Sequence, residues 1–357
     1  MILQQFHVNQ SCISFGHACF AEALTATPLD AYSTVFAVSQ ANIWDFHGQA
    51  LRAVLPPAFQ DRHLYLMPDG EATKNLETFG KLMEWLADHK ADRHSLLLVL
   101  GGGVVGDLSG FVASCYMRGM DWIYVPTTLL AQQDASIGGK TAVNLPHGKN
   151  LVGHFWEPRA VIIDSSVLST LPIRQIHAGY MEFLKHGMLD GPELLAKAMD
   201  LPVQPERWQD HMAVLAEGVA VKARIVREDP LERGKRRLLN LGHTLGHALE
   251  SYTRYQCFLH GEAVGIGLLF AVLLGRRLGG RHEWRGLAET VRTRLPGFDP
   301  RAWDREAVLD LTLIDKKGVA GQIPWIVPFA PGEIEIVKGV DRQHLVSAYD
   351  ELVELLS

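Results

Sequence analysis

Short apolar runs alternate with helical stretches over the first 170 residues of the chain. We expect the runs TVFAVS, HLYLM, SLLLVL, WIYV and AVII to be β-strands, at residues 34–39, 63–67, 95–100, 122–125 and 160–163. A helical pattern at 71–89 separates the second run from the third. Parallel neighbours need a crossover connection, so this alternation predicts an α/β domain with a largely parallel sheet.

The pattern changes at Leu171-Pro172. Helical periodicity dominates from there on, at residues 182–189, 212–227, 238–251, 263–278 and 342–356. Asp229-Pro230 separates two of these helices, because proline cannot continue a helix. The sequence therefore predicts an α/β domain over 1–171 and a mainly α-helical domain over 172–357.

Composition excludes several kinds of partner. Lys plus Arg is 34 and Asp plus Glu is 40, a net charge of −6, so we expect no nucleic-acid binding. No run approaches the ~20 apolar residues of a membrane span, and the N-terminus has no basic segment followed by an apolar one. We therefore expect no membrane partner. The 4 cysteines show no CxxC spacing, which favours a protein of the reduced cytoplasm.

The segment GGGVVGD, residues 101–107, directly follows the run SLLLVL. Glycines between a strand and a helix let backbone N–H groups approach a phosphate, and the helix N-terminus favours negative charge. The segment is not a strict GxGxxG fingerprint. It predicts either a nucleotide site or merely a tight turn.

The segment DASIGGKT, residues 134–141, contains a Gly-Lys-Thr triplet. A P-loop would need glycine where Asp134 stands, so we reject an ATPase or kinase. Lys140, Lys149 and Asn150 place two cations and an amide within a short stretch, which suits an anionic substrate. Solvated surface lysines would have the same spacing.

Three histidines occur within 18 residues. His243 and His247 are four residues apart on a predicted helix, and His260 follows in a His-Gly-Glu triplet. The spacing indicates a metal site, although each histidine taken alone is more often structural, and the absence of HExxH excludes a zincin protease. Glu182 and Lys185 are three apart among apolar neighbours, so they are either a surface ion pair or a pair that is not fully solvated.

One predicted helix face is polar. Arg236, Asn240, His243 and His247 follow one another at steps of four, three and four, between leucines, which indicates a wet cleft. Lys222 lies on the preceding predicted helix. Taken alone, the segment Asp315-Lys316-Lys317 predicts an exposed charged turn.

Taken together, these segments resemble a known family. GGGVVGDLSGF, CYMRGM, VPTTLLAQQDASIGGKTAVN, GKNLVG, AGYMEFLKHG, LLNLGHTLGHALE, LHGEAVGIG and DKK are similar to the motifs of the 3-dehydroquinate synthases, which belong to the sugar phosphate cyclases. The resemblance implies a Rossmann-like NAD-binding domain and an α-helical domain that carries Zn²⁺ or Co²⁺. It also implies an active site in the cleft between the domains, and a homodimer.

The resemblance assigns roles residue by residue. The implied metal ligands are Glu182, His243 and His260, with His247 facing the substrate instead. The implied cofactor residues are Asn42, Asp69, Glu71, Lys74, Gly102, Gly103, Asp107, Thr127, Thr128, Lys140 and Lys149. The implied catalytic and substrate residues are Asp134, Lys140, Lys149, Asn150, Lys185, Lys222, Arg236, Asn240, His247 and Lys316. Arg118 is similar to an arginine that reaches the neighbouring subunit's site.

The implied reaction converts 3-deoxy-arabino-heptulosonate 7-phosphate to 3-dehydroquinate and phosphate, in aromatic amino acid biosynthesis. Arg236 with Asn240 suits the carboxylate of this substrate, which sedoheptulose 7-phosphate and glucose 6-phosphate lack. The alternatives are another sugar phosphate cyclase, such as one acting on an aminated substrate, a metal-dependent polyol dehydrogenase, or a silent paralogue. Met181, His186 and Gln133 depart from the usual family residues near the site.

Overall fold

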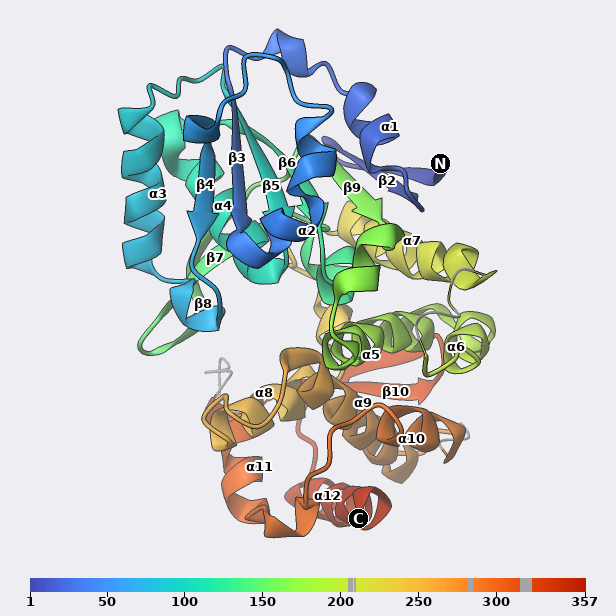
Figure 1. Cartoon of the computed structure of the whole chain (residues 1–357). Coiled ribbons are helices and arrows are strands. Elements are labelled where there is room, and N and C mark those ends of the chain that lie inside the picture. The colour runs from blue at the N-terminus through green and yellow to red at the C-terminus, as the bar shows by residue number, and fades with distance from the viewer. Residues whose placement is uncertain (205–207, 209, 282–284, 315–322) are drawn as a thin grey trace. The chain divides into compact units, whose positions relative to one another are not determined.

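The computed structural model describes residues 1–204, 208, 210–281, 285–314 and 323–357 (Figure 1). The chain divides into two compact units. The N-terminal unit comprises residues 1–171 and 222–231, and the C-terminal unit comprises residues 172–221 and 232–357. Residues 222–231 are the end of one helix and the turn after it, so the N-terminal unit is built from two stretches of the chain.

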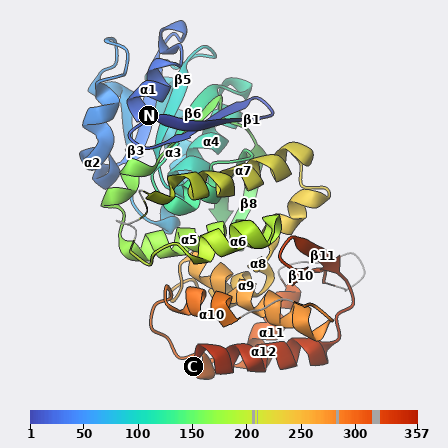
Figure 2. The same ribbon diagram turned by 90° about the vertical axis from the view of Figure 1, so that its right-hand side faces the viewer.

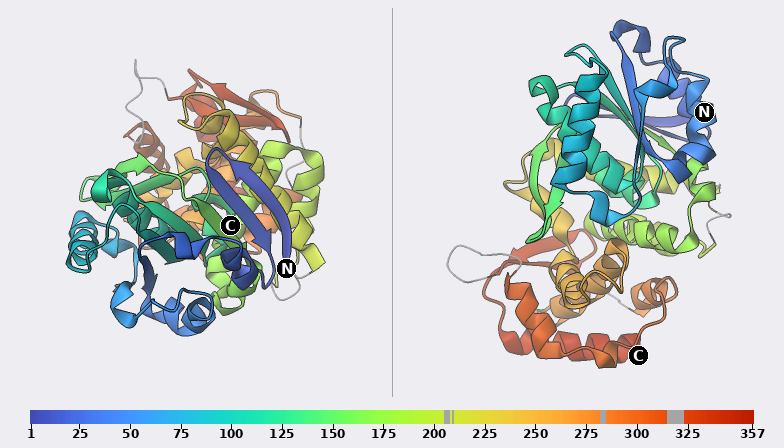
Figure 3. Two further views of the ribbon diagram at one scale, coloured as in Figure 1. Left: turned by 90° about the horizontal axis from the view of Figure 1, so that it is seen from above. Right: turned by 60° about the vertical axis from the view of Figure 1, so that its left-hand side comes forward.

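The N-terminal unit contains a seven-stranded sheet with the order β1-β2-β9-β6-β5-β3-β4. Its strands are β1 (Ile2–Val8), β2 (Ser11–Gly16), β3 (Val35–Gln40), β4 (Leu64–Met67), β5 (Leu96–Gly101), β6 (Asp121–Pro126) and β9 (Ala160–Asp164). Every neighbouring pair is parallel except β1 with β2, which form a hairpin at the sheet edge (dark blue in Figure 3). The predicted α/β domain and its five predicted strands are confirmed, whereas the edge hairpin was not predicted.

Helices cover both faces of this sheet. Residues of α1 (Phe20–Thr25) and α2 (Ala41–Arg52) share one buried cluster with Leu96, Leu98 and Leu100 of β5. Residues of α3 (Leu76–Asp88) and α4 (Gly103–Cys115) share another with Leu97 and Val99. A strand that is buried on both faces reads as a continuous apolar run rather than an alternating one, which explains SLLLVL.

The connections reverse direction between β3 and β5. These two strands are neighbours, but β3 leads to β4 on one side and β5 leads to β6 on the other. Ligands in open α/β sheets bind at the carboxyl ends of the strands at such a reversal. The fold of the N-terminal unit therefore marks this edge as a binding site.

The rest of the N-terminal unit follows β6. A single π-turn spans Ala131–Ala135, and β7 (Lys140–Leu145) then pairs with β8 (Gly148–Phe155) in an antiparallel hairpin that was not predicted. Helix α7 (Met212–Glu228) contributes its last residues to this unit.

The C-terminal unit is mainly helical, as predicted (Figure 2). Besides the first part of α7 it contains α5 (Ile173–Asp190), α6 (Pro192–Met199), α8 (His243–Tyr252), α9 (His260–Arg277), α10 (Arg285–Arg292), α11 (Arg305–Ile314) and α12 (Arg342–Leu356). A hairpin of β10 (Trp325–Ala330) and β11 (Glu333–Val337) was not predicted. Helix α9 is buried from Gly261 to Gly275, and no helix among the described residues has the length and apolar character of a membrane span.

The prediction of one helix over 238–251 is wrong. A 3-10 turn spans Lys235–Asn240, and α8 begins only at His243. Gly242 separates them with a φ of +80°, and a Cβ at Gly242 would lie 2.8 Å from the backbone nitrogen of Leu268. Arg236 and Asn240 therefore do not share a continuous helix face with His243 and His247.

Candidate functional site

The residues expected to hold the cofactor lie just beyond the carboxyl ends of four adjacent parallel strands. They are Asn42 after β3, Asp69, Glu71 and Lys74 after β4, Gly102, Gly103 and Asp107 after β5, and Thr127 and Thr128 after β6. Lys140 and Lys149 are the exceptions, because they lie in the β7–β8 hairpin. The structure thus brings the other residues to one edge of the sheet, which is the edge where the connections reverse. Neither motif spacing nor composition predicts this order of strands.

The glycine-rich turn at 101–106 packs α4 closely on the sheet. Gly102 is the residue before α4, and no side chain of the described residues caps this helix end. A Cβ at Gly102 would lie 2.9 Å from the methyl carbon of Thr128, and one at Gly106 would lie 2.3 Å from the Tyr124 ring. Tyr124 also donates a hydrogen bond to the carbonyl oxygen of Gly102, at 2.9 Å. The turn therefore holds the start of α4 in place with N–H groups directed outward, as an anion requires.

A polar network surrounds Lys74, which is only 4% exposed. Its ammonium donates to Asp107 and to the side-chain oxygen of Asn150, each at 2.5 Å. Asn144 donates to Glu71 at 2.7 Å and accepts from the backbone of Asn150 at 2.9 Å. Burial raises the pKa of Asp107, and the Lys74 ammonium opposes that rise. The network links the end of β4 with the β7–β8 hairpin, and Asn144 is a member that the sequence did not indicate.

Two predicted substrate residues form an ion pair. The Lys222 ammonium, at the start of the second stretch of the N-terminal unit, lies 2.8 Å from a carboxylate oxygen of Asp134 and also donates to the backbone carbonyl of Asp134. Lys140 is exposed at the first position of β7, and Lys149 is half-buried on β8. Lys140 begins a strand and not a helix, which agrees with the rejection of a P-loop.

Arg118 lies on an unusual turn. Met117, Arg118 and Gly119 have φ values of +50°, +66° and +121°. A Cβ at Gly119 would lie 2.6 Å from the Trp156 ring, so glycine is required there. The turn presents Arg118 on the surface of the N-terminal unit, where its side chain is exposed.

In the C-terminal unit, Glu182 and Lys185 lie deep within α5. Their exposed fractions are 0% and 1%, and the ammonium of Lys185 contacts one carboxylate oxygen, Oε2, of Glu182. The expectation that the pair is not fully solvated is confirmed. The other oxygen, Oε1, is buried and accepts no hydrogen bond from the described residues. A buried carboxylate oxygen is costly unless something binds it.

Two histidines face this oxygen. Nε2 of His243 lies 3.6 Å from Glu182 Oε1, and Nε2 of His260 lies 3.7 Å from the same atom. These distances are too long for hydrogen bonds. Three ligand atoms around one tetrahedral ion would be about 3.3 Å apart for bonds of about 2 Å, so the spacing fits a metal ion between them.

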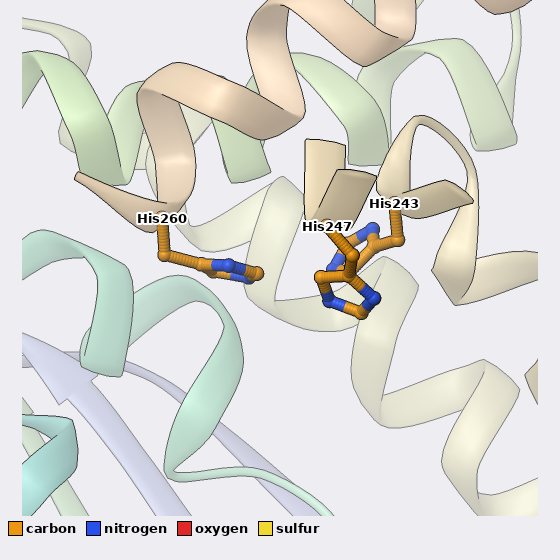
Figure 4. Close-up of side chains that lie close together, drawn as sticks. All are labelled: His243, His247 and His260. Carbon is orange, nitrogen blue, oxygen red and sulfur yellow. The ribbon is translucent and has the colours of Figure 1, made fainter. Parts of the chain in front are cut away.

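The third histidine lies beside the other two (Figure 4). The ring centre of His247 is 5.4 Å from that of His243 and 5.8 Å from that of His260. One nitrogen of each of the three histidines lies within 4.8 Å of a nitrogen of the other two. The three therefore also form a possible metal cluster. Geometry therefore supports both the set Glu182, His243 and His260 and the histidine cluster as places for an ion.

The outer nitrogens of His243 and His260 show which atom of each ring carries the lone pair. Nδ1 of His243 lies 3.1 Å from the backbone carbonyl oxygen of Leu241, so this nitrogen is the donor and Nε2 carries the lone pair. Nδ1 of His260 is likewise 3.1 Å from a carboxylate oxygen of Glu250. Burial, and then the nearby Lys185 ammonium, holds the pKa of His243 well below its usual value, so its ring is neutral, as a metal ligand must be.

Helix α9 begins at His260 and is tied to α5. A Cβ at Gly261 would lie only 1.9 Å from the carbonyl oxygen of Ala178, so the two helices touch at backbone level. Arg174 of α5 donates two hydrogen bonds to the buried carboxylate of Glu262, at 2.7 and 2.9 Å. The same carboxylate accepts from the backbone of Leu259 at 2.8 Å. These contacts fix the start of α9, and with it the backbone of His260.

Arg236 and Asn240 lie on the 3-10 turn before α8. Arg236 is 1% exposed, which is unusual for an arginine. Asn240 donates to Glu232 at 2.9 Å, and this orients its amide. Sequence reasoning missed Glu232 as well as Arg174, Glu250 and Glu262. Of these, Glu250 had a usable signal, because it lies seven residues after His243 on a predicted helix.

The structure thus divides the predicted site residues between its two units. The N-terminal unit holds the predicted cofactor residues together with Arg118, Asp134, Lys140, Lys149, Asn150 and Lys222, and the C-terminal unit holds Glu182, Lys185, Arg236, Asn240, His243, His247 and His260. Lys316 lies outside the described residues. All four cysteines are described and are free thiols.

Known proteins resemble this chain over most of its length. The family model described as 3-dehydroquinate synthase N-terminal matches residues 64–178, and the one described as 3-dehydroquinate synthase C-terminal matches residues 179–318. A 3-dehydroquinate synthase from Acaryochloris marina is 39% identical, with 89% of this chain and 88% of that protein covered. One from Methylococcus capsulatus is 42% identical, with 81% and 84% covered. The solved 2-epi-5-epi-valiolone synthase from Streptomyces hygroscopicus subsp. jinggangensis 5008, with NAD⁺ and Zn²⁺ bound, has a TM-score of 0.80 at 25% identity, with 99% of each chain covered.

Proposed function

The chain belongs to the 3-dehydroquinate synthase family, and we propose that it converts 3-deoxy-arabino-heptulosonate 7-phosphate to 3-dehydroquinate and inorganic phosphate. The reaction proceeds by oxidation of the C5 alcohol, β-elimination of phosphate, reduction of the C5 ketone and intramolecular aldol closure. The hydride that is removed is returned, so the net change is loss of phosphate and not a redox change.

One observation carries the proposal. Glu182 Oε1 is buried and accepts no hydrogen bond from the described part of the chain, while Nε2 of His243 and Nε2 of His260 face it at 3.6 and 3.7 Å. One carboxylate and two imidazoles form an open zinc site, with coordination positions left for substrate oxygens. The valiolone synthase with Zn²⁺ bound, which shares this fold, supports the same metal here.

The proposed NAD⁺ site lies at the carboxyl ends of β3, β4, β5 and β6. The start of α4, which no described side chain caps, offers backbone N–H groups to the pyrophosphate, and Gly102 leaves a space that a Cβ would fill against Thr128. The network of Lys74, Asp107 and Asn150 holds the rim of this site. When bound, NAD⁺ would accept and return a hydride, and the metal would polarise the neighbouring substrate oxygens.

The chain's own residues bind and orient a doubly anionic substrate. We assign the substrate carboxylate to Arg236 and Asn240, because a buried guanidinium forms strong paired hydrogen bonds with a carboxylate and Glu232 orients the amide. We assign the phosphate and hydroxyl groups to Lys140, Lys149, Asn150, Lys185, Lys222 and, from the part of the chain not described, Lys316. Asp134 positions the Lys222 ammonium through their ion pair.

His247 has a different task in this proposal. It stands one turn along α8 from His243, beside the metal ligands, and its imidazole would hold or move a proton on a substrate hydroxyl. The substrate's own phosphate would take the C6 proton as it leaves, which needs no separate side-chain base. The cations keep one substrate geometry through all steps.

We infer a homodimer in which Arg118 completes the partner's site. Its exposed position on a turn of three positive φ values supports this, because the turn holds the guanidinium outward. Mixing an Arg118→Ala chain with a Lys185→Ala chain should restore some activity, since one site of each mixed dimer would carry neither substitution. The reduced state of all four cysteines agrees with a cytoplasmic enzyme.

Phosphate release tests the function. The purified protein, given NAD⁺ and Zn²⁺, should release phosphate from 3-deoxy-arabino-heptulosonate 7-phosphate without any build-up of NADH absorbance at 340 nm. Sedoheptulose 7-phosphate and glucose 6-phosphate are the comparison substrates. Faster release from either one would overturn the substrate assignment, and NADH formed in proportion to substrate would indicate a polyol dehydrogenase.

A further inference from the structure

The side chain of His260 lies between two carboxylates of the C-terminal unit. Its Nε2 lies 3.7 Å from Glu182 Oε1, on the side of the proposed metal, and its Nδ1 lies 3.1 Å from Glu250 Oε2 on the opposite side of the ring. The Glu250 side chain is 2% exposed, whereas that of His260 is 32% exposed. The Glu250 carboxylate is thus more buried than the His260 ring and lies on the side of that ring away from the proposed metal.

This contact determines which nitrogen of His260 carries the proton. An ionised carboxylate can only accept, so Nδ1 must be the donor and the lone pair of a neutral ring then lies on Nε2. A negative acceptor also makes the opposite nitrogen a stronger ligand. His243 obtains the same orientation from the backbone carbonyl of Leu241, which no substitution removes. Glu250 is therefore the outer contact that can be altered by mutation.

The helix backbones hold Glu250 and His260 at a fixed separation. Glu250 follows His243 by seven residues, which is two turns of α8, so it lies on the same side of the helix. Helices α8 and α9 touch where a Cβ at Gly246 would lie 3.1 Å from the carbonyl oxygen of Ala263. A Cβ at Gly267 would lie 1.9 Å from that of Gly242. Helices this close fix the separation of the backbones that carry Glu250 and His260.

We propose that Glu250 is a positioning residue of the metal site, whose carboxylate fixes the tautomer and direction of the His260 imidazole. The inference rests on the proposed function in taking Glu182, His243 and His260 as the metal ligands. It adds a fourth side chain, which is not itself a ligand and acts through the outer nitrogen of His260.

Zinc affinity, measured by competition with a chromophoric chelator, tests this role without reference to turnover. Glu250→Gln keeps an acceptor for Nδ1–H but removes the charge, so the zinc dissociation constant should rise about tenfold, and Glu250→Ala should raise it about 100-fold. The visible spectrum of the Co²⁺-loaded protein should change in the same order. Glu217→Gln, which removes an exposed partner of Lys197 on the same unit, is the matched control and should bind zinc as the wild type does.

Thermal unfolding of the metal-free proteins separates positioning from a purely structural role. The Gln variant should melt close to the wild type and still bind zinc more weakly. Wild-type zinc affinity in both Glu250 variants, with weak binding in His260→Ala, would overturn the role of Glu250 and leave the ligand set standing. Wild-type affinity in His260→Ala would instead overturn the ligand set of the proposed function, and the role of Glu250 with it.

Discussion

The backbone of Gly261 lies directly against that of Ala178. A Cβ at position 261 would come within 1.9 Å of the Ala178 carbonyl oxygen, so α9 can approach α5 only because the residue after His260 is glycine. Since α5 carries Glu182 and α9 begins at His260, this contact sets the distance between two proposed metal ligands.

Gly261→Ala is therefore expected to harm both stability and metal binding. Separating the helices should lower the free energy of unfolding by about 2–3 kcal/mol, as overpacking usually does, and should weaken zinc binding. Chemical denaturation and chelator competition measure the two effects. Gly286→Ala in α10 meets no atom of the described residues within 4 Å and is the matched control, with a gain of about 0.5–1 kcal/mol from helix propensity. A Gly261→Ala protein with normal zinc affinity would show that the contact does not set the site.

His247 and His260 should behave differently on substitution. His260→Ala should lose bound zinc, because it removes one of three ligands. His247→Ala should keep its zinc and turn over slowly, because the ring is proposed to face the substrate. Metal content after dialysis and phosphate release measure the two properties. Zinc loss in His247→Ala with retention in His260→Ala would favour a site built on His243 and His247.

Arg236→Lys tests the carboxylate assignment. Lysine keeps the charge but cannot form the paired hydrogen bonds of a guanidinium, so kcat/KM for the heptulosonate phosphate should fall about 100-fold. The KM for NAD⁺ should stay near its wild-type value, because Arg236 belongs to the C-terminal unit and the proposed cofactor residues to the N-terminal one. A thermal melt checks that the variant is folded. An unchanged kcat/KM would remove Arg236 from the substrate site.

The cysteines should differ strongly in reactivity. Burial, followed by the nearby Asp164 carboxylate, raises the pKa of the Cys19 thiol from 9.0 to about 12. Only about one molecule in ten thousand would carry the Cys19 thiolate at pH 8 in the folded state. A disulfide reagent should therefore react quickly with the exposed Cys115 and Cys257 and reach Cys19 only on unfolding.

Two substitutions assign the phases of this reaction. Cys115→Ser should remove one fast thiol, and Cys19→Ser should remove none. The raised pKa also makes the free energy of unfolding depend on pH. The unfolded chain releases this proton above pH 9, while the folded chain keeps it to about pH 12. The free energy of unfolding should fall across that range, and less so in Cys19→Ser. A fast phase that shrinks in Cys19→Ser would contradict the buried position.

The sequence allowed the central part of the sheet to be predicted because its strands are buried on both faces. SLLLVL has no polar side, which is typical of an interior strand. The β1–β2 and β7–β8 hairpins were missed because β1 and β8 are largely exposed, and their alternation is weak. The strand order could not be predicted from the sequence either, since it depends on which strands pair and not on their composition.

The prediction of the site relied on the spacing of residues within single segments of the chain. Steps of four, three and four predict Arg236 and Asn240 on the helix of His243 only if that helix is unbroken. Gly242 breaks it with a φ of +80°, required by the approach of α9, a contact that no single segment reveals. Glu182 is likewise far from both histidines in the sequence. Spacing could suggest the histidine cluster, but only the family resemblance suggested the carboxylate.

The return of residues 222–231 to the N-terminal unit has a consequence for how the protein is made. The Lys222–Asp134 ion pair cannot form until the ribosome has added residue 222, more than fifty residues after the last strand of the parallel sheet. A fragment that ends at residue 171 would lack this segment altogether. Synthesis therefore leaves an interval in which the first unit is present but incomplete, and a nascent chain stalled before residue 222 should be more open to proteases and chaperones than one stalled after residue 231.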